Sequence, residues 1–134
     1  MKYYIDSKIK AGFEDTVQLV RESLKEENFG VLTEIDIHEK LKEKLNVDFR
    51  KYKILGACNP PYAYKALQEE NKIGTMLPCN VIIQELDNNE IEVAAVDPVA
   101  SMKAVENKEL ADIAAEIKIK LARVIENVGA KSNR

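Results

Sequence analysis

The chain has 134 residues, of which 46% are hydrophobic and 32% charged, and its formal net charge is −3. This length is typical of one domain with its own hydrophobic core, so we expect a single domain over residues 1–134. The composition excludes an intrinsically disordered chain. The mild negative charge gives no electrostatic reason to expect nucleic acid or an anionic membrane as a partner.

The N-terminal sequence and the cysteines indicate the compartment. Met1-Lys2-Tyr3-Tyr4-Ile5-Asp6 reaches a charge before an apolar segment of signal-peptide length has formed. No stretch approaches the roughly 18 apolar residues of a membrane-spanning helix. We therefore expect a cytoplasmic protein with no membrane partner. Its two cysteines should be free thiols, and they do not form the Cys-x-x-Cys pair typical of dithiol redox or zinc sites.

Hydrophobic periodicity predicts five strands and several helices. The expected strands are residues 3–9, 31–37, 52–58, 81–86 and 91–96. The expected helices are residues 12–28, a short lysine-rich helix at 38–45, a helix at about 60–70 and a brief helical turn at Asp97-Pro98. The last helix is long, with an apolar stripe from Leu110 to Val128, and we expect Gly129 to end it.

The order of these elements is β-α-β-(α)-β-α-β-β-α. Residues 31–37 alternate apolar and polar, which predicts a strand with one buried side. The last two strands flank Asp87-Asn88-Asn89-Glu90, which predicts a hairpin. We therefore expect an α+β two-layer sandwich, with a mixed, largely antiparallel sheet and helices on one face.

The stretch Cys58-Asn59-Pro60 joins a strand to a helix. Asparagine is a favoured N-cap residue and proline suits the first helical position, so the junction has a sufficient structural explanation. The same geometry also allows a function, because the N-terminus of a helix presents unpaired N–H groups to an anionic ligand. It could also lower the pKa of the neighbouring Cys58 thiol.

A second cysteine, Cys79, follows Pro78 at the start of the next predicted strand. If the two strands are neighbours, Cys58, Asn59, Pro60, Pro78 and Cys79 line one cleft, and these five are our candidate ligand-binding residues. Buried cysteines more often serve as small apolar core residues than as reactive groups. Both interpretations remain open at this point.

Other chemistry is less well supported. His38 is the only histidine and, with Cys58 and Cys79, it is a weak candidate metal ligand, so we assign no metal and no cofactor. A single histidine gives no readable Ser-His-Asp order, and we assign no catalytic residue. A locally basic segment has the features of a solvated helix face rather than a nucleic-acid site; its cations are Lys40, Lys42, Lys44, Arg50, Lys51 and Lys53.

Several motifs, in order, resemble those of the domain-of-unknown-function 302 family. They are Glu34-Ile35-Asp36, Gly56-x-Cys58-Asn59-Pro60, Leu77-Pro78-Cys79-Asn80 and Asp97-Pro98. The resemblance covers nearly the whole chain and implies a small α+β fold and a homodimer. It supplies no established catalytic activity. It also implies that other branches of the family carry apolar residues in place of the two cysteines.

These observations favour a small dimeric, non-catalytic ligand-binding or sensing domain with an unidentified small ligand in a cleft near Asn59-Pro60. One alternative is a thiol-dependent redox or soft-metal-binding protein that uses Cys58 and Cys79. Another is a protein–protein interaction module, whose sign would be an exposed apolar patch.

Overall fold

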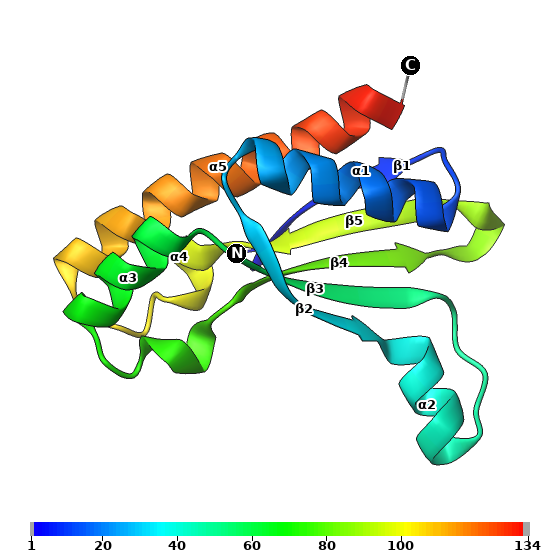
Figure 1. The fold of residues 1–134 in the computed structure, drawn as a ribbon, viewed down its shortest axis with the longest axis horizontal. Coiled ribbons are helices and arrows are strands. Elements are labelled where there is room, and N and C mark those ends of the chain that lie inside the picture. The colour runs from blue at the N-terminus through cyan, green and yellow to red at the C-terminus, as the bar shows by residue number, and fades with distance from the viewer. Residues whose placement is uncertain (1, 133–134) are drawn as a thin grey trace.

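A five-stranded sheet organises the fold in the computed structural model, which describes residues 2–132 (Figure 1). The strands are β1 (Tyr4–Ile9), β2 (Gly30–Asp36), β3 (Tyr52–Cys58), β4 (Cys79–Glu85) and β5 (Ile91–Val96). They lie in the order β1-β5-β4-β3-β2, and all four neighbouring pairs are antiparallel. The expected α+β class and order of elements are confirmed, and the sheet is antiparallel throughout.

Two helices cover one face of this sheet, as Figure 1 shows. They are α1 (Phe13–Glu26) and α5 (Lys108–Ser132). The core lies between them and the sheet, and Leu24 of α1, Val81 of β4 and Leu121 of α5 are fully buried in it. Apolar residues recur every three or four positions in the helices and every second position in β4 and β5, so both layers turn one apolar side inward.

The remaining elements lie at the ends of the sheet. They are the helices α2 (Ile37–Leu45), α3 (Pro60–Glu69) and α4 (Pro98–Ser101) and the short 3₁₀ helices η1 (Ile73–Met76) and η2 (Asp87–Asn89). The η2 turn joins β4 to β5, as the hairpin prediction required. Asn28 adopts a left-handed φ of 66° just after α1, a conformation common where a helix ends.

Two predictions about the elements are wrong. The strand β2 buries none of its residues, because it is the edge strand and an irregularity between Val31 and Thr33 interrupts its alternation. The helix α5 continues past Gly129 to Ser132, so this glycine does not end it. The neighbouring Val128 is buried and Lys131 pairs with Glu26 of α1 at 2.5 Å, which gives the last turn tertiary support.

The opposite face of the sheet is turned away from α1 and α5. The register places Ile35, Ile54, Ile82 and Ala94 side by side across β2, β3, β4 and β5, with Asp6 of β1 at the end of the row. None of these residues is fully buried, and Ile35 is 40% exposed. We call this side of the sheet the open face.

Candidate functional site

The shared motif residues meet where β3 and β4 lie side by side. Pro78 stands directly before β4 and packs on Gly56 of β3, where a Cβ atom would come within 2.7 Å of the proline Cγ. The same Cβ would lie 2.2 Å from Oγ1 of Thr33 on β2. The glycine is therefore required by close contact on both sides, and no positive φ is involved.

The predicted cleft residues do come together. Cys58, Asn59, Pro78 and Cys79 line one crevice under α3 and α5, and Pro60 follows as the first residue of α3. Other side chains nearly fill this crevice, and its free volume is about 20 Å³. A space of that size holds about one water molecule.

The Asn59 side chain does not cap α3, contrary to the prediction. The residue has the extended backbone of an N-cap position, but its side chain makes no capping hydrogen bond. Its Nδ2 donates instead to the backbone oxygen of Glu27, at 3.3 Å, and the residue is only 6% exposed. Asn59 thus ties the β3–α3 junction to the end of α1, a long-range contact that the local sequence pattern does not reveal.

The two thiols are in an apolar setting that opposes ionisation. Burial raises the pKa of Cys58, which goes against the possibility that the helix N-terminus lowers it. Burial, and secondarily the charge of a nearby Cys58 thiolate, raise the pKa of Cys79 to about 11. Both cysteines are free. Neither has the electropositive surroundings of an activated nucleophile.

His38 lies apart from these cysteines. It lies inside α2, and its Nδ1 is 3.0 Å from the backbone nitrogen of Tyr52, at the start of β3. Cys58 ends the same strand, roughly 20 Å away at the usual rise per residue. Within residues 2–132, no group of three or more His, Cys, Asp or Glu side chains is arranged to hold a metal ion.

Sequence reasoning missed a charged cluster on the helix side of β2 and β3. Lys53 is 7% exposed, and its Nζ lies 2.6 Å from Glu34 and 3.5 Å from Asp36. Arg21 of α1 pairs with the other oxygen of Glu34. Hydrogen bonds from Lys53 and Arg21 lower the pKa of Glu34. Lys53 therefore does not belong to a solvated basic face.

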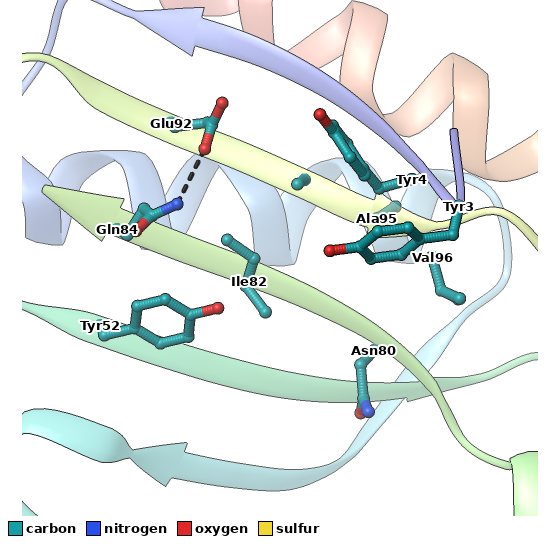
Figure 2. Close-up of a pocket in the computed structure, with 10 residues that line it drawn as sticks. Tyr3, Tyr4, Tyr52, Asn80, Ile82, Gln84, Glu92, Ala95 and Val96 are labelled. Atoms are coloured by element: carbon teal, nitrogen blue, oxygen red, sulfur yellow. Dashed lines mark hydrogen bonds between the residues drawn. The ribbon is translucent and has the colours of Figure 1, made fainter. Parts of the chain in front are cut away.

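Sequence reasoning also missed a hollow on the open face, shown in Figure 2. Its volume is about 430 Å³, within the usual range of ligand sites. Side chains of β1, β3, β4 and β5 line it, together with Tyr3, which stands just before β1. The lining residues are Tyr3, Tyr4, Tyr52, Asn80, Ile82, Gln84, Glu92, Ala94, Ala95 and Val96.

Hydrogen bonds hold two polar side chains of the hollow, Gln84 and Glu92, in place. Gln84 Nε2 donates to Glu92 Oε1 at 2.8 Å, as drawn in Figure 2. Arg50 Nε donates to Gln84 Oε1, also at 2.8 Å, and the guanidinium lies 5.8 Å from the centre of the Tyr52 ring. The hollow thus has an apolar floor around Ile82 and one fixed polar end.

A signal for the hollow is present in the sequence. Along β4, buried Cys79, Val81 and Ile83 alternate with Asn80, Ile82 and Gln84, whose side chains point to the other side. An isoleucine in the middle of an otherwise polar side indicates that this side is not simply exposed to water. The alternation along β4 does not reveal that β3 is its neighbour, and it is this pairing that brings Tyr52 opposite Gln84.

The comparisons with known proteins agree with the fold. The family model described as "Domain of unknown function DUF302" matches residues 5–128. A solved structure described as the "uncharacterized conserved protein DUF302 from Bacillus stearothermophilus" is 30% identical, with a TM-score of 0.89, and the match covers 96% of this chain and 99% of that one. No curated protein matches the chain.

The described part of the chain contains no helix long and apolar enough to cross a membrane. Two of the motifs through which the sequence resembles the family contain Gly56 and Pro78, and these two motifs join β3, β4 and α3 in the structure. With a family model that spans most of its length, the chain belongs to the DUF302 family.

Proposed function

We propose that this protein is a small, homodimeric, non-catalytic ligand-binding domain, and that the ligand lies in the hollow on the open face. The observation that carries the proposal is the hollow itself, about 430 Å³ lined by aromatic, amide and carboxylate side chains from neighbouring strands. The crevice at Asn59 and Cys58 is the poorer choice, because its free volume of about 20 Å³ leaves no room for a metabolite.

The lining favours a flat ligand with a hydrogen-bond donor at one end. The Tyr3, Tyr4 and Tyr52 rings and Ile82 offer apolar and aromatic surface, on which a ring can stack. Glu92 and Gln84 offer acceptor oxygens at one end. A heteroaromatic amine matches both features, since its ring suits the aromatic side chains and its N–H groups suit the carboxylate.

Titration of the protein with tryptamine and with adenine, followed by saturation-transfer NMR, tests this proposal. Tyr3→Ala and Glu92→Gln remove an aromatic wall and the charge of the hollow. Tyr64→Ala is a matched control, since Tyr64 on α3 is 66% exposed and Tyr3 is 70% exposed, but Tyr64 does not line the hollow.

We expect at least one probe to bind, with affinity reduced at least fivefold by Tyr3→Ala and by Glu92→Gln and unchanged by Tyr64→Ala. Absence of binding by both probes, or equal affinity in all four proteins, overturns the hollow as the ligand site. The homodimer is supported by the general prevalence of twofold oligomers. Sedimentation equilibrium tests it separately, and a monomer contradicts it.

A further inference from the structure

The small crevice beside β3, β4 and α3 gathers sulfur-containing side chains. Cys58, Cys79 and Met102 all line it. The chain has two cysteines and three methionines, so three of its five sulfur-containing residues border one small space. They come from the end of β3, the start of β4 and the position directly after α4, and α3 and α4 lie at the same end of the sheet (Figure 1). The fold, rather than a local motif, therefore brings the three residues together.

The two cysteines are neighbours in the sheet. Cys79 pairs with Ala57, so Cys58 is one residue farther along the adjacent strand, and standard strand spacing and rise put the two Cα atoms roughly 6 Å apart. Consecutive side chains of a regular strand point to opposite sides, but β3 ends at Cys58 and the chain turns into α3. Both cysteines line the crevice, and both thiols are free. A Cys58 thiolate is near enough for its charge to raise the pKa of Cys79.

The rest of the lining favours a soft metal ion over a hard one. Among the described residues that line the crevice, none carries a carboxylate or an imidazole. Phe29 and Ile117 are typical of the remaining, mostly apolar lining, and the Asn59 amide already donates to a backbone oxygen. Structural zinc sites take four ligands, and calcium and magnesium prefer oxygen. Thiolate and thioether ligands select Cu(I), a soft ion that accepts two or three sulfur atoms.

The size of the crevice matches a single bare ion. Its free volume of about 20 Å³ holds about one water molecule, so it excludes a metabolite and also a metal ion with its water shell. We propose that the crevice is a binding site for one cuprous ion, Cu(I), held by the Cys58 and Cys79 thiolates and the Met102 thioether. Met102 is 5% exposed, and its unbranched, flexible side chain lets the thioether adjust to the ion.

Binding replaces protons and moves no electrons. Each thiol releases its proton to solvent as its sulfur bonds to the ion, because the thiolate is the form that binds metals. Copper stays in the +1 state, so two thiolates and one ion leave a single negative charge at the site. The N-terminus of α3, which begins at Pro60, places a partial positive charge beside Cys58 and offsets part of it. Cys58 is partly exposed whereas Cys79 is buried, so the ion enters at Cys58.

The copper site is separate from the hollow on the open face. The two spaces share no lining residue, so each can be filled or emptied without the other. The family resemblance implies that other branches carry apolar residues in place of the two cysteines. The site is therefore a property of this chain and not of the family as a whole. Failure of the copper site leaves the proposed function standing, because tryptamine and adenine binding tests the hollow independently.

Anaerobic titration of the reduced full chain with Cu(I), in competition with the chelator bathocuproine disulfonate, tests the inference. The variants Cys58→Ser, Cys79→Ala and Met102→Leu each remove one proposed ligand. Met76→Leu is the control, because it makes the same chemical change at a methionine that does not line the crevice. Copper X-ray absorption counts the sulfur ligands. Circular dichroism establishes which variants fold, and Cys58→Ser and Met102→Leu decide the matter if Cys79→Ala does not fold.

We expect one Cu(I) per chain, surrounded by sulfur alone. The dissociation constant should rise at least thousandfold in each cysteine variant, at least tenfold in Met102→Leu with the loss of one sulfur neighbour, and less than twofold in Met76→Leu. Absence of stoichiometric Cu(I) binding, or unchanged affinity in Cys58→Ser, overturns the site. Unchanged affinity and sulfur count in Met102→Leu overturn the three-ligand arrangement. Zn²⁺ that binds as tightly as Cu(I) overturns the assignment of the metal.

Discussion

Pro78 packs directly on Gly56, so closely that a Cβ atom on residue 56 would lie 2.7 Å from the proline ring. Real Cβ atoms essentially never show contacts this short, and the same Cβ would lie 2.2 Å from Thr33 Oγ1, so a side chain at position 56 must displace both Pro78 and the Thr33 hydroxyl. Pro78 leads into β4 and Thr33 belongs to β2, so Gly56 sets the approach of both flanking segments to β3.

We therefore predict that Gly56→Ala destabilises the protein by about 1–3 kcal/mol, the usual result of overpacking. Gly30→Ala is the control, because a Cβ there has no atom within 4 Å and Gly30 also lies in the sheet. Urea denaturation measures both free energies of unfolding. Equal stability of the two variants would show that Pro78 and Thr33 move aside freely.

The thiols give a second prediction. A pKa of about 11 for Cys79, against an ordinary value of 9.0, reduces its thiolate fraction near neutral pH by about a hundredfold. Native Cys79 should therefore react with iodoacetamide at pH 8 at least a hundredfold more slowly than in urea-unfolded protein. Cys58, whose pKa burial also raises, should react faster than Cys79 because it is less buried. Mass spectrometry after timed quenching gives both rates.

Rapid alkylation of either native thiol, at the rate of the unfolded chain, would instead support a thiol-dependent activity. The Cys79→Ser variant separates reactivity from packing: it removes the thiol from a site lined by apolar groups such as Phe29 and Met102. We expect it to lower the free energy of unfolding without changing the binding of tryptamine or adenine.

In the Asp97-Pro98 motif, Asp97 has a structural role: its side chain caps the N-terminus of α4. Its Oδ1 accepts hydrogen bonds from the N–H groups of Val99 and Ala100 at 3.0 and 3.3 Å, and its Oδ2 lies 2.9 Å from Lys118 Nζ on α5. Burial raises the pKa of this carboxyl, but the Lys118 ammonium and the two N–H groups outweigh burial and hold the pKa below its usual value of 3.8.

A carboxyl whose pKa is lower in the folded state stabilises the protein above the unfolded pKa and loses this effect as the pH falls through the folded pKa. We predict that Asp97→Asn costs about 0.5–1 kcal/mol at pH 7, because it keeps an acceptor for the N-cap and loses a half-exposed ion pair. The difference from the unchanged protein should disappear as the pH falls below 3.8. A difference that is constant from pH 7 to pH 2 would contradict this role.

The Glu34–Lys53 pair gives a fourth prediction. Lys53 is nearly buried and Glu34 is its closer anion, so Glu34→Gln leaves an ammonium with Asp36 as its remaining carboxylate partner. We expect a loss of about 1–3 kcal/mol, typical of a buried charge deprived of a partner. Glu43→Gln is the control, because its pairing with Lys40 is exposed. Thermal melts at neutral pH compare the two, and equal losses would contradict the cluster.

The order of elements follows from the sequence because helices and strands have different hydrophobic periods. Leu110 to Val128 repeats with helical spacing and Val81 to Ile83 alternates, so both layers are readable. Gly129 misled the prediction because the contacts of its neighbours with α1 outweigh the local preference of glycine.

The candidate site was only partly predictable. Cys58, Asn59, Pro78 and Cys79 share one crevice, as expected once β3 and β4 are neighbours. The free volume at that crevice depends on long-range packing by Met102 and Ile117, which local patterns do not contain. The hollow depends on strand order, because Tyr52 meets Gln84 only when β3 and β4 pair.

The central claim, that a ligand lies in the hollow on the open face, is tested most directly by NMR of isoleucine methyl groups during titration with tryptamine or adenine. Ile82 lines the hollow, whereas Ile119 is 57% exposed on α5 and does not line it. The account predicts that the Ile82 methyl signals shift as the probe is added, while those of Ile119 stay unchanged. Titrations in which neither probe shifts Ile82, or in which Ile82 and Ile119 shift alike, would contradict the claim.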